Sequence, residues 1–589
     1  MELVYLWVEK YKNIHEQGFN FSPRFECKYE NNELTICDKK KKECKDNNYI
    51  ENFFGDNINV TAIVGKNGSG KSNIFEASIS NFMLNYMRPI GENYKVLTFF
   101  YNEEDEKIYY KALNSSLSNL NGESLLEINT LGKYIIKPDK LPFTFHYNYS
   151  LDWMRNDDEN SLDFDKLYHK TDNYKTPILL QPNKSNNKIS IANIDYIATR
   201  DILYFTIQNG IKFDFIEEFF VPISCELTYF ISDISKQDDN IFFQKLEEQA
   251  IKSWDIEHFR FEAYCYILRK TIDKGEKDKF SFIKDAEFKK KLMDNEWDKN
   301  FDNLIEIIKN HSFDDLYDNR LEYQIRKIKD TFKFLEYIKD FTTESMEKDL
   351  IKGKKNIKDN KDILLHLPPY VQVEFFDKDD VSFYSLSYGQ KFIIKFIYSL
   401  LAHLKNLESH PEYRNINILL DELEQGLHPE WQKKFLDLLI QVLKEQKDFK
   451  FNVICATHSP FILSDIPSSN IYFIKDGKKD IGVKQQTFGA NIHTLLSDSF
   501  FMDDGLMGEF AKDKINDVYN FIVHHKTDKI KSKEDAQAII DIVGEPLIQR
   551  ELQQLFDKKF ELTNMSIDDE ISLLERKLKA LKEIKNDTN

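Results

Sequence analysis

The sequence predicts an α/β fold whose parallel sheet is built from two separate blocks of the 589-residue chain. Three observations support this prediction. A β-branched run at residues 59–64 leads into a glycine-rich turn and then a helical pattern. Short apolar strand patterns alternate with helical patterns over residues 366–500. Between the two blocks lies a long stretch with very little glycine or proline, which favours helices.

The first block covers residues 1–150. Strand patterns at 3–8, 25–29 and 34–36 are separated by polar turns, and the run at 59–64 has the composition of a buried parallel strand. A helix is predicted from residue 73 to about residue 87. These elements form the amino-terminal half of the predicted α/β domain.

Glycine and proline mark the next boundaries. Eight of the 19 glycines lie in residues 1–132 and eight in 389–544, which leaves only Gly210, Gly275 and Gly353 between them. No proline occurs from residue 223 to residue 367. Apolar residues recur at helical spacing around 304–308 and 325–338, without sustained heptads. We therefore predict a mostly helical insertion at residues 151–365.

The second block covers residues 366–500. Strands are predicted at 371–376, 381–384, 416–420 and 451–456, and helices at 391–404 and 431–443. Such alternation is typical of a parallel sheet covered by helices. Residues 501–589 are predicted to form a helical C-terminal region that ends in an amphipathic segment at 571–584.

Composition excludes several classes of protein. The formal charge of −18 argues against wholesale wrapping of nucleic acid, and six cysteines without C-x-x-C spacing favour a reduced chain. No apolar stretch reaches about 18 residues and no basic leader precedes one, so we expect a cytoplasmic protein without a membrane span. One local basic cluster could contact DNA, although a charged loop in water is the preferred interpretation: Lys352, Lys354, Lys355 and Lys358.

A phosphate-binding motif follows the first buried strand. The pattern G-x4-G-K-S, a P-loop or Walker A motif, is supplied by Gly65, Lys66, Asn67, Gly68, Ser69, Gly70, Lys71 and Ser72. Its glycines let backbone N–H groups curl around phosphate oxygens at a helix N-terminus, while the lysine adds a cation and the terminal serine can ligate Mg²⁺. A nucleotide site for ATP with Mg²⁺ is the resulting prediction.

Two adjacent carboxylates end the strand at 416–420. Asp421 is expected to hold Mg²⁺ together with Ser72, as a Walker B aspartate does. Glu422 is expected to orient or deprotonate the attacking water, which makes it a catalytic candidate. Adjacent carboxylates are common at ordinary strand ends, but together with a P-loop they predict ATP hydrolysis.

Two further motifs resemble those of ABC-type ATPases. The segment Leu386 to Gln390 resembles the LSGGQ signature, with Tyr in place of the first Gly, and supplies the nucleotide-binding candidates Ser387, Tyr388, Gly389 and Gln390. His458 follows the strand predicted at 451–456 and resembles the catalytic switch histidine of these enzymes. The resemblance implies an ABC-type head, split by the insertion, that pairs head-to-tail with a second copy. The signature of each copy then closes on the γ-phosphate bound by the other.

Narrower resemblances suggest a biological role. Residues 423–429 look like the Glu-x-x-Leu-His-Pro form of SMC-like and OLD-like ATPases. Residues 488–501, 505–509 and 544–546 look like the tail of PtuA-type ATPases of Septu and of some retron defence systems. That resemblance implies anti-phage defence, with an HNH nuclease of the PtuB type as partner and DNA or a retron RNA–DNA as a further one. Residues 143–149 occupy the place of the Q-loop without a Gln.

Alternative functions remain open on the sequence alone. An SMC-like ATPase could act mechanically on DNA in repair, and an OLD-like ATPase would carry its own TOPRIM nuclease. A TOPRIM domain binds its metals with a strand-end Glu and an Asp-x-Asp pair. The only segment similar to such a strand is 471–477, where Asp476 has no Asp two residues later, so we predict no intrinsic nuclease. The long insertion argues against a transporter ATPase. Asn491, His493 and Asp498 are interpreted as helix capping and packing residues rather than a catalytic cluster.

Overall fold

The computed structural model describes most of the two predicted blocks and little of the insertion between them. The described residues are 1–31, 33–41, 49–82, 94–113, 119–121, 128–130, 141–148, 178–181, 191–209, 220–229, 330–331, 333–338, 340–342, 353–367, 371–408, 410–480, 486–499, 507–524 and 529–560. Most of the predicted insertion and the segment 571–584 lie outside them. The chain divides into two compact units, Met1–Phe501 and Met502–Asn589.

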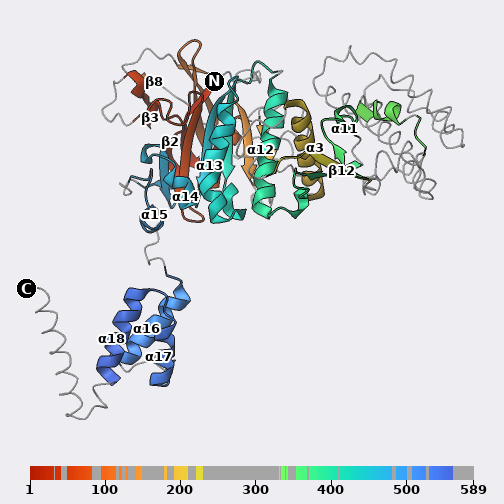
Figure 1. Ribbon diagram of the computed structural model, residues 1–589. Helices are drawn as coiled ribbons and strands as arrows, with labels where there is room; N and C mark the ends of the chain where they lie inside the picture. Colours follow the sequence, from red (N-terminus) through yellow and green to blue (C-terminus); the bar gives the residue numbers. More distant parts are fainter. Residues whose placement is uncertain are drawn as a thin grey trace, which may run out of the picture. The chain divides into compact units, whose positions relative to one another are not determined.

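A seven-stranded sheet forms the centre of the first unit (Figure 1). Its strands, in spatial order, are β11 (Ile178–Gln181), β10 (Phe143–Asn148), β15 (Asn415–Asp421), β16 (Lys450–Thr457), β5 (Ile58–Gly65), β17 (Ile471–Lys475) and β18 (Lys478–Lys479). The first six are parallel and β18 is antiparallel to β17. Strands from both blocks, with β11 from the predicted insertion, therefore share one sheet, which confirms the predicted α/β fold.

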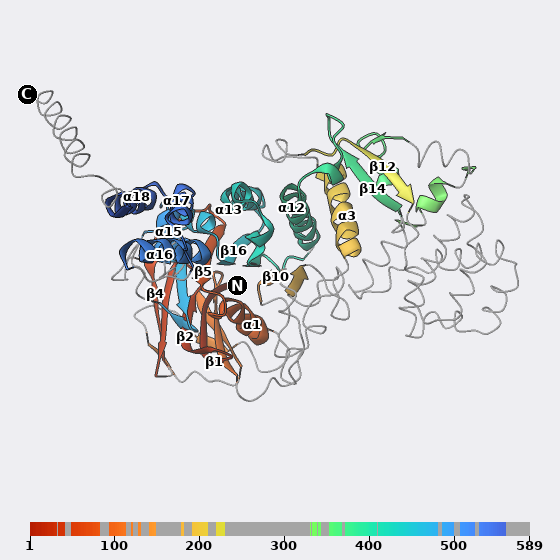
Figure 2. The same cartoon turned by 90° about the horizontal axis from the view of Figure 1, so that it is seen from below.

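The two faces of this sheet pack against different layers. On one face Val60, Ala62 and Val64 join the core formed with α3 (Ile191–Asn209), α12 (Tyr388–Leu407) and α13 (Pro429–Lys444). On the other face Ile63 packs with α1 (Lys71–Phe82) and with an antiparallel sheet. Figure 2 shows α12 and α13 on one side of the central strands, and α1 with the antiparallel strands on the other side. Burial on both faces explains the continuous apolar composition of β5 and β16.

The antiparallel part comes from the amino-terminal block. A five-stranded sheet has the order β2 (Ile14–Asn20), β1 (Glu2–Tyr11), β6 (Lys95–Asn102), β7 (Lys107–Leu113) and β9 (Ile128–Thr130). A three-stranded sheet contains β3 (Phe25–Glu30), β4 (Glu33–Asp38) and β8 (Asn119–Asn121). The strands predicted at 3–8, 25–29 and 34–36 are confirmed as β1, β3 and β4. The mostly polar β2 was not predicted, because its alternation is weak.

The second block contains one incorrect prediction of a strand. β14 (Val371–Phe376) forms a sheet with β12 (Ser224–Tyr229) and β13 (Lys355–Asn356), as expected for 371–376. The strand predicted at 381–384 is instead mostly a 3₁₀ helix, η8 (Phe383–Ser385). The Ser382 side chain accepts a hydrogen bond from Tyr384 N at 3.1 Å, which turns the chain after a single bridge to Phe376. Side-chain capping by serine favours such a turn over a strand.

Shorter elements complete the first unit. These are η1 (Lys39–Lys41), α11 (Lys361–Leu364), η9 (Leu423–Gly426), α14 (Pro460–Ser464), η10 (Ser468–Asn470) and α15 (Ile492–Ser499). Asn491 Oδ1 accepts a hydrogen bond from His493 N at 2.9 Å at the start of α15, which confirms the capping interpretation. Cys37 is disulfide-bonded, which contradicts the expected reduced chain, whereas the described Cys27, Cys225 and Cys455 are free and buried.

The described part of the second unit is helical. It contains α16 (Glu509–Val523), α17 (Lys533–Asp541) and α18 (Pro546–Phe560), which bury Val518, Ile540 and Leu552 in a core of their own. Across the described residues of both units, no helix combines the length and the apolar character that crossing a bilayer requires.

Candidate nucleotide-binding site

The register of the central sheet brings the predicted site residues to one edge. Asn148 pairs with Asp421 across β10 and β15, and Asp421 pairs with Ala456 across β15 and β16. Thr457 then pairs with Val64 across β16 and β5. Because parallel strands end at the same edge, the residues that follow β5, β15 and β16 converge there, where ligands of parallel α/β sheets bind.

The P-loop follows β5 and enters α1, as predicted. Gly68 and Gly70 have φ of +77° and +106°, a region that favours glycine. A Cβ at Gly65 would lie 2.3 Å from the carbonyl oxygen of Ile474, so this position also requires glycine. Asn13, in the turn between β1 and β2, donates to the carbonyl oxygen of Gly68 at 3.1 Å. The loop is thus packed from two sides.

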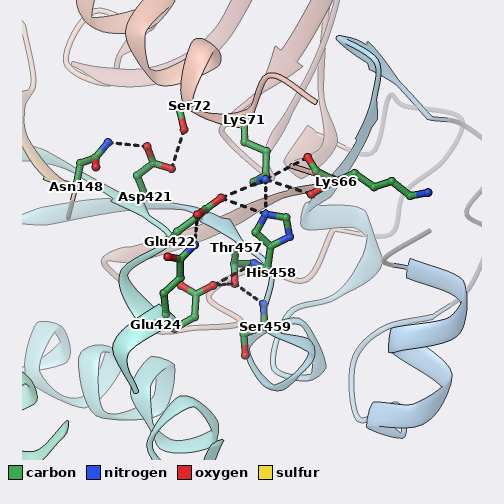
Figure 3. Close-up of polar contacts among 12 residues, drawn as sticks. Lys66, Lys71, Ser72, Asn148, Asp421, Glu422, Glu424, Thr457, His458 and Ser459 are labelled. Atoms are coloured by element: carbon green, nitrogen blue, oxygen red, sulfur yellow. Dashed lines mark hydrogen bonds and ion pairs between the residues drawn. The ribbon is translucent and has the colours of Figure 1, made fainter. Parts of the chain in front are cut away.

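Lys71 is the most constrained cation of the site. Its side chain is 4 % exposed, and Nζ donates to the carbonyl oxygen of Gly65 at 3.1 Å. Nζ also lies 3.3 Å from Glu422 Oε1 and 2.6 Å from His458 Nε2. Burial lowers the pKa of Lys71, and the Glu422 carboxylate opposes that shift. Figure 3 shows Lys71 pointing at both partners, whereas the Lys66 side chain extends away from them.

Glu422 turns toward this cation because of its backbone conformation. It has φ of +52° in the left-handed region, which is uncommon for a residue with a Cβ, and its N–H donates to the carbonyl oxygen of Ala456 at 2.9 Å. Its Oε1 lies 3.1 Å from His458 Nε2. The hydrogen bond with His458 is the main cause that lowers the pKa of Glu422, and nearby Lys71 adds to it. The carboxylate is therefore held ionised.

His458 Nε2 faces two partners with opposite requirements. An ammonium group only donates hydrogen bonds, so Nε2 accepts when a charged Lys71 binds it. The same nitrogen must carry a proton to donate to Glu422. One ring nitrogen cannot do both at once. Displacement of Lys71 toward another anion would release His458 Nε2 to Glu422.

Asp421 forms a second polar cluster beside the first. Its Oδ1 accepts from Ser72 Oγ at 3.2 Å, and its Oδ2 accepts from Asn148 Nδ2 at 2.8 Å. Burial raises the pKa of Asp421 to about 7, so an adjacent cation would stabilise the ionised form. Hydroxyl, carboxylate and amide oxygens are the ligands that Mg²⁺ prefers, completed by substrate phosphates and water. The residues present therefore fit a magnesium ion held by Ser72 and Asp421.

Asn148 was missing from the sequence-based site. It is the last residue of β10 and lies within residues 143–149, the predicted place of the Q-loop, where no site residue was assigned because the segment has no Gln. The available signal was a polar residue that ends an apolar strand, as Asp421 also does. Among the described residues, no group of three or more His, Cys, Asp or Glu side chains could hold a metal ion.

The signature candidates lie elsewhere in the chain. Ser387 caps the N-terminus of α12, where its Oγ donates to Gln390 Oε1 at 2.8 Å and its N–H donates to the same oxygen at 3.0 Å. Ser387 is exposed, and Tyr388 is 64 % exposed. Within the described part of the chain, no hydrogen bond or ion pair joins Ser387 or Gln390 to the P-loop, Asp421, Glu422 or His458.

The start of α12 instead packs on the segment after Glu422. A Cβ at Gly389 would lie 3.1 Å from Trp431 Cδ1, and a Cβ at Gly426 would lie 2.9 Å from Tyr388 Cε1. The tyrosine that replaces a signature glycine therefore covers Gly426 of η9. Of the basic cluster, Lys354 pairs with Asp380 and lies 3.7 Å from the Phe376 ring, while Lys352 lies outside the described residues.

A parallel sheet, a P-loop and a facing Asp–Glu pair at one edge define a P-loop nucleotide-binding protein. Comparison with known families agrees with this class. Residues 50–463 match the AAA ATPase domain family, and the chain belongs to that family.

Individual relatives match this chain only over a short stretch or at low sequence identity. The chain is 34 % identical over 109 residues to the Retron Ec83 probable ATPase of Escherichia coli. These residues are 18 % of this chain and span only 19 % of that relative. Among solved structures, the SmcHead bound to the C-winged helix domain of ScpA aligns with 82 % of this chain and 96 % of its own, at 13 % identity and a TM-score of 0.23. The structure of the recombination mediator protein RecF aligns with 81 % of this chain and 97 % of the RecF chain, at 15 % identity and a TM-score of 0.21.

Proposed function

We propose that this chain is an ABC-type ATPase that binds ATP between two heads and thereby controls a partner effector nuclease in anti-phage defence. The observation that carries the ATPase assignment is the cluster of Lys71, Glu422 and His458 beside the pair of Ser72 and Asp421. These residues supply a phosphate-binding cation, a base and a metal site within one edge of the sheet.

Binding of ATP would first rearrange Lys71. Its present acceptors include the carbonyl oxygen of Gly65, Glu422 Oε1 and His458 Nε2, and phosphate oxygens would compete for the same ammonium group. Once Lys71 turns to the phosphates, His458 Nε2 is free to donate to Glu422. The nucleotide thus brings the base and the histidine into their working arrangement.

Hydrolysis would then use Glu422 as the general base. Its lowered pKa keeps the carboxylate able to accept a proton from water. The water oxygen forms a bond to the γ-phosphorus while the bond from that phosphorus to the β–γ bridging oxygen breaks, giving ADP and phosphate. When bound, Mg²⁺ would neutralise charge on the phosphates, and Ser72 and Asp421 are the residues that would hold it.

A second head would complete each site. Ser387, Tyr388, Gly389 and Gln390 are proposed to contact the γ-phosphate held by the P-loop of the other copy. The exposed serine at the positive end of a 20-residue helix supports this assignment. ATP would then join the two copies, and its hydrolysis would separate them.

The experiment for the two-head model is size measurement of Glu422→Gln by light scattering. With Mg²⁺ and ATP we expect this variant to form a dimer or a higher oligomer, because it binds ATP but loses the base. Wild type without nucleotide and Lys71→Ala with ATP are the matched controls. If Glu422→Gln with ATP is no larger than these controls, the two-head model is wrong.

The effector assignment is supported by the partial match to a retron ATPase. We propose an HNH nuclease of the PtuB type as the effector and no nuclease in the chain itself. Co-expression with the neighbouring gene product, followed by DNA cleavage assays with and without ATP, tests both statements. Cleavage by the isolated chain that persists in Lys71→Ala would refute the second, and a neighbouring repair exonuclease would refute the first.

A further inference from the structure

A buried carboxylate lies directly behind the catalytic candidates. Glu424 belongs to η9 and is only 4 % exposed. Its Oε1 accepts hydrogen bonds from Thr457 Oγ1 and, at 3.1 Å, from the backbone N–H of His458 (Figure 3). Glu424 therefore holds the backbone of the residue whose ring meets Glu422 and Lys71.

A chain of hydrogen bonds fixes this arrangement to α13. Thr457 Oγ1 also accepts from Ser459 N at 2.9 Å, and Ser459 Oγ donates to Gln432 Oε1 at 2.8 Å. Gln432 Nε2 donates back to the carbonyl oxygen of Glu424 at 3.3 Å. The residues on both sides of His458 are thus bound to η9 and α13 by side chains, and the bonds form a closed loop.

The chemical nature of Glu424 indicates more than packing. Burial raises the pKa of Glu424, because an ionised carboxylate loses its hydration there. A buried charge seldom adds net stability compared with an apolar residue of similar size. What this carboxylate provides is one oxygen, Oε1, that accepts two hydrogen bonds from the segment that carries His458.

We infer that Glu424 is a positioning residue for ATP hydrolysis, which sets the orientation of His458 toward Glu422 through Thr457 and the His458 backbone. This inference rests on the proposed ATPase function. Among the described residues, Glu424 forms no hydrogen bond or ion pair with the P-loop and acts on Lys71 only through its charge, so we expect its main effect on turnover rather than on nucleotide binding. Displacement of a catalytic group by about 1 Å can cost on the order of 100-fold in rate.

The experiment compares Glu424→Ala with Glu424→Gln in the full-length chain. We expect Glu424→Ala to lower kcat about 10- to 100-fold with the Kd for a fluorescent ATP analogue within about twofold of wild type. Glu424→Gln retains an oxygen acceptor of the same reach and should recover most of kcat. Wild-type kcat in Glu424→Ala, or an equal loss in both variants, would overturn the inference.

A double-mutant cycle with His458→Ala separates positioning from a general structural role. If Glu424 acts through His458, the double variant should turn over no more slowly than His458→Ala alone. Losses that multiply would show that Glu424 acts independently of His458 and would overturn the inference. Wild type that neither binds nor hydrolyses ATP would instead refute the proposed function itself.

A second pair of variants covers the case in which Glu424→Ala does not fold. Thr457→Val keeps the shape of the side chain but removes the hydroxyl that donates to Glu424 and accepts from Ser459. Thr457→Ser keeps that hydroxyl. We expect Thr457→Val, but not Thr457→Ser, to lower kcat. In the His458→Ala background, Thr457→Val should cause no further loss of kcat. Equal kcat in both Thr457 variants would overturn the inference.

Discussion

The P-loop edge of the central sheet and the N-terminus of α12 both match nucleotide-binding motifs, yet they differ in burial and in pairing. At the P-loop edge, Lys71 and Asp421 are 4 % and 5 % exposed and are bound to partners from other structural elements. At the start of α12, Ser387 is exposed and forms its hydrogen bonds with Gln390 of the same helical turn.

The difference shows which half of the site one chain can complete. Buried charges need partners within the fold, and the P-loop edge supplies them. An exposed helix N-terminus needs nothing from the rest of its own chain, so it can serve a ligand brought by another molecule. Variants at the two places should therefore separate nucleotide binding from turnover.

The largest expected effect is on ATP binding by Lys71→Ala. Loss of the buried ammonium group removes the cation that phosphates would meet, and we expect affinity for ATP to fall at least about 100-fold, as for other charged contacts in dry sites. Calorimetric titration measures it. The control is Lys66→Ala, at a P-loop residue whose side chain points away from the cluster. Its affinity for ATP should stay within about threefold of wild type. Equal losses in both would contradict the assignment of Lys71.

Ser387→Arg should spare binding but lower turnover. Because Ser387 lies apart from the P-loop cluster, ATP affinity of the single chain should change less than about twofold, while a bulky cation in a composite site should lower kcat about 100-fold, the size seen when an anion-stabilising donor is lost. Steady-state phosphate release measures it. Ser385→Arg, at a neighbouring exposed serine, is the control. Normal hydrolysis by Ser387→Arg would rule out the two-head site.

Two glycines test the difference in packing. Gly65→Ala places a methyl group against the carbonyl oxygen of Ile474, so we expect a loss of about 1–3 kcal/mol in the free energy of unfolding. Gly426→Ala meets only the exposed ring of Tyr388, which can move, and should cost less than about 0.5 kcal/mol. Denaturant unfolding of the two variants compares them, and similar losses would contradict the contrast.

The smallest expected effect concerns Asn148. Because it holds Asp421 Oδ2, Asn148→Ala should raise the Mg²⁺ concentration for half-maximal hydrolysis about tenfold, the lower range for residues that orient metal ligands. Titration of the ATPase rate with Mg²⁺ measures it. Asn102→Ala, at the end of β6 in another sheet, should leave this concentration unchanged. An unchanged value for Asn148→Ala would show that Asp421 needs no such support.

Local patterns predicted the elements that carry the motifs. β5, β15, β16, α12 and α13 all follow from apolar periodicity, and the strand that failed, at 381–384, was converted to a 3₁₀ turn by the Ser382 cap. The P-loop, Asp421, Glu422 and His458 were found because each motif is specified within a few residues. Spacing could not reveal that His458 Nε2 faces both Lys71 and Glu422.

What the sequence determined by itself is the chemistry at each strand end: a P-loop, two carboxylates, a histidine and a serine cap. Tertiary structure alone decided which of these ends meet. Asn148 reaches Asp421 across 273 positions of the chain because β10 pairs in register with β15. Glu424 reaches His458 because η9 follows β15, the strand that pairs with β16. Strand order and register depend on packing of whole layers, and no short sequence window contains that information.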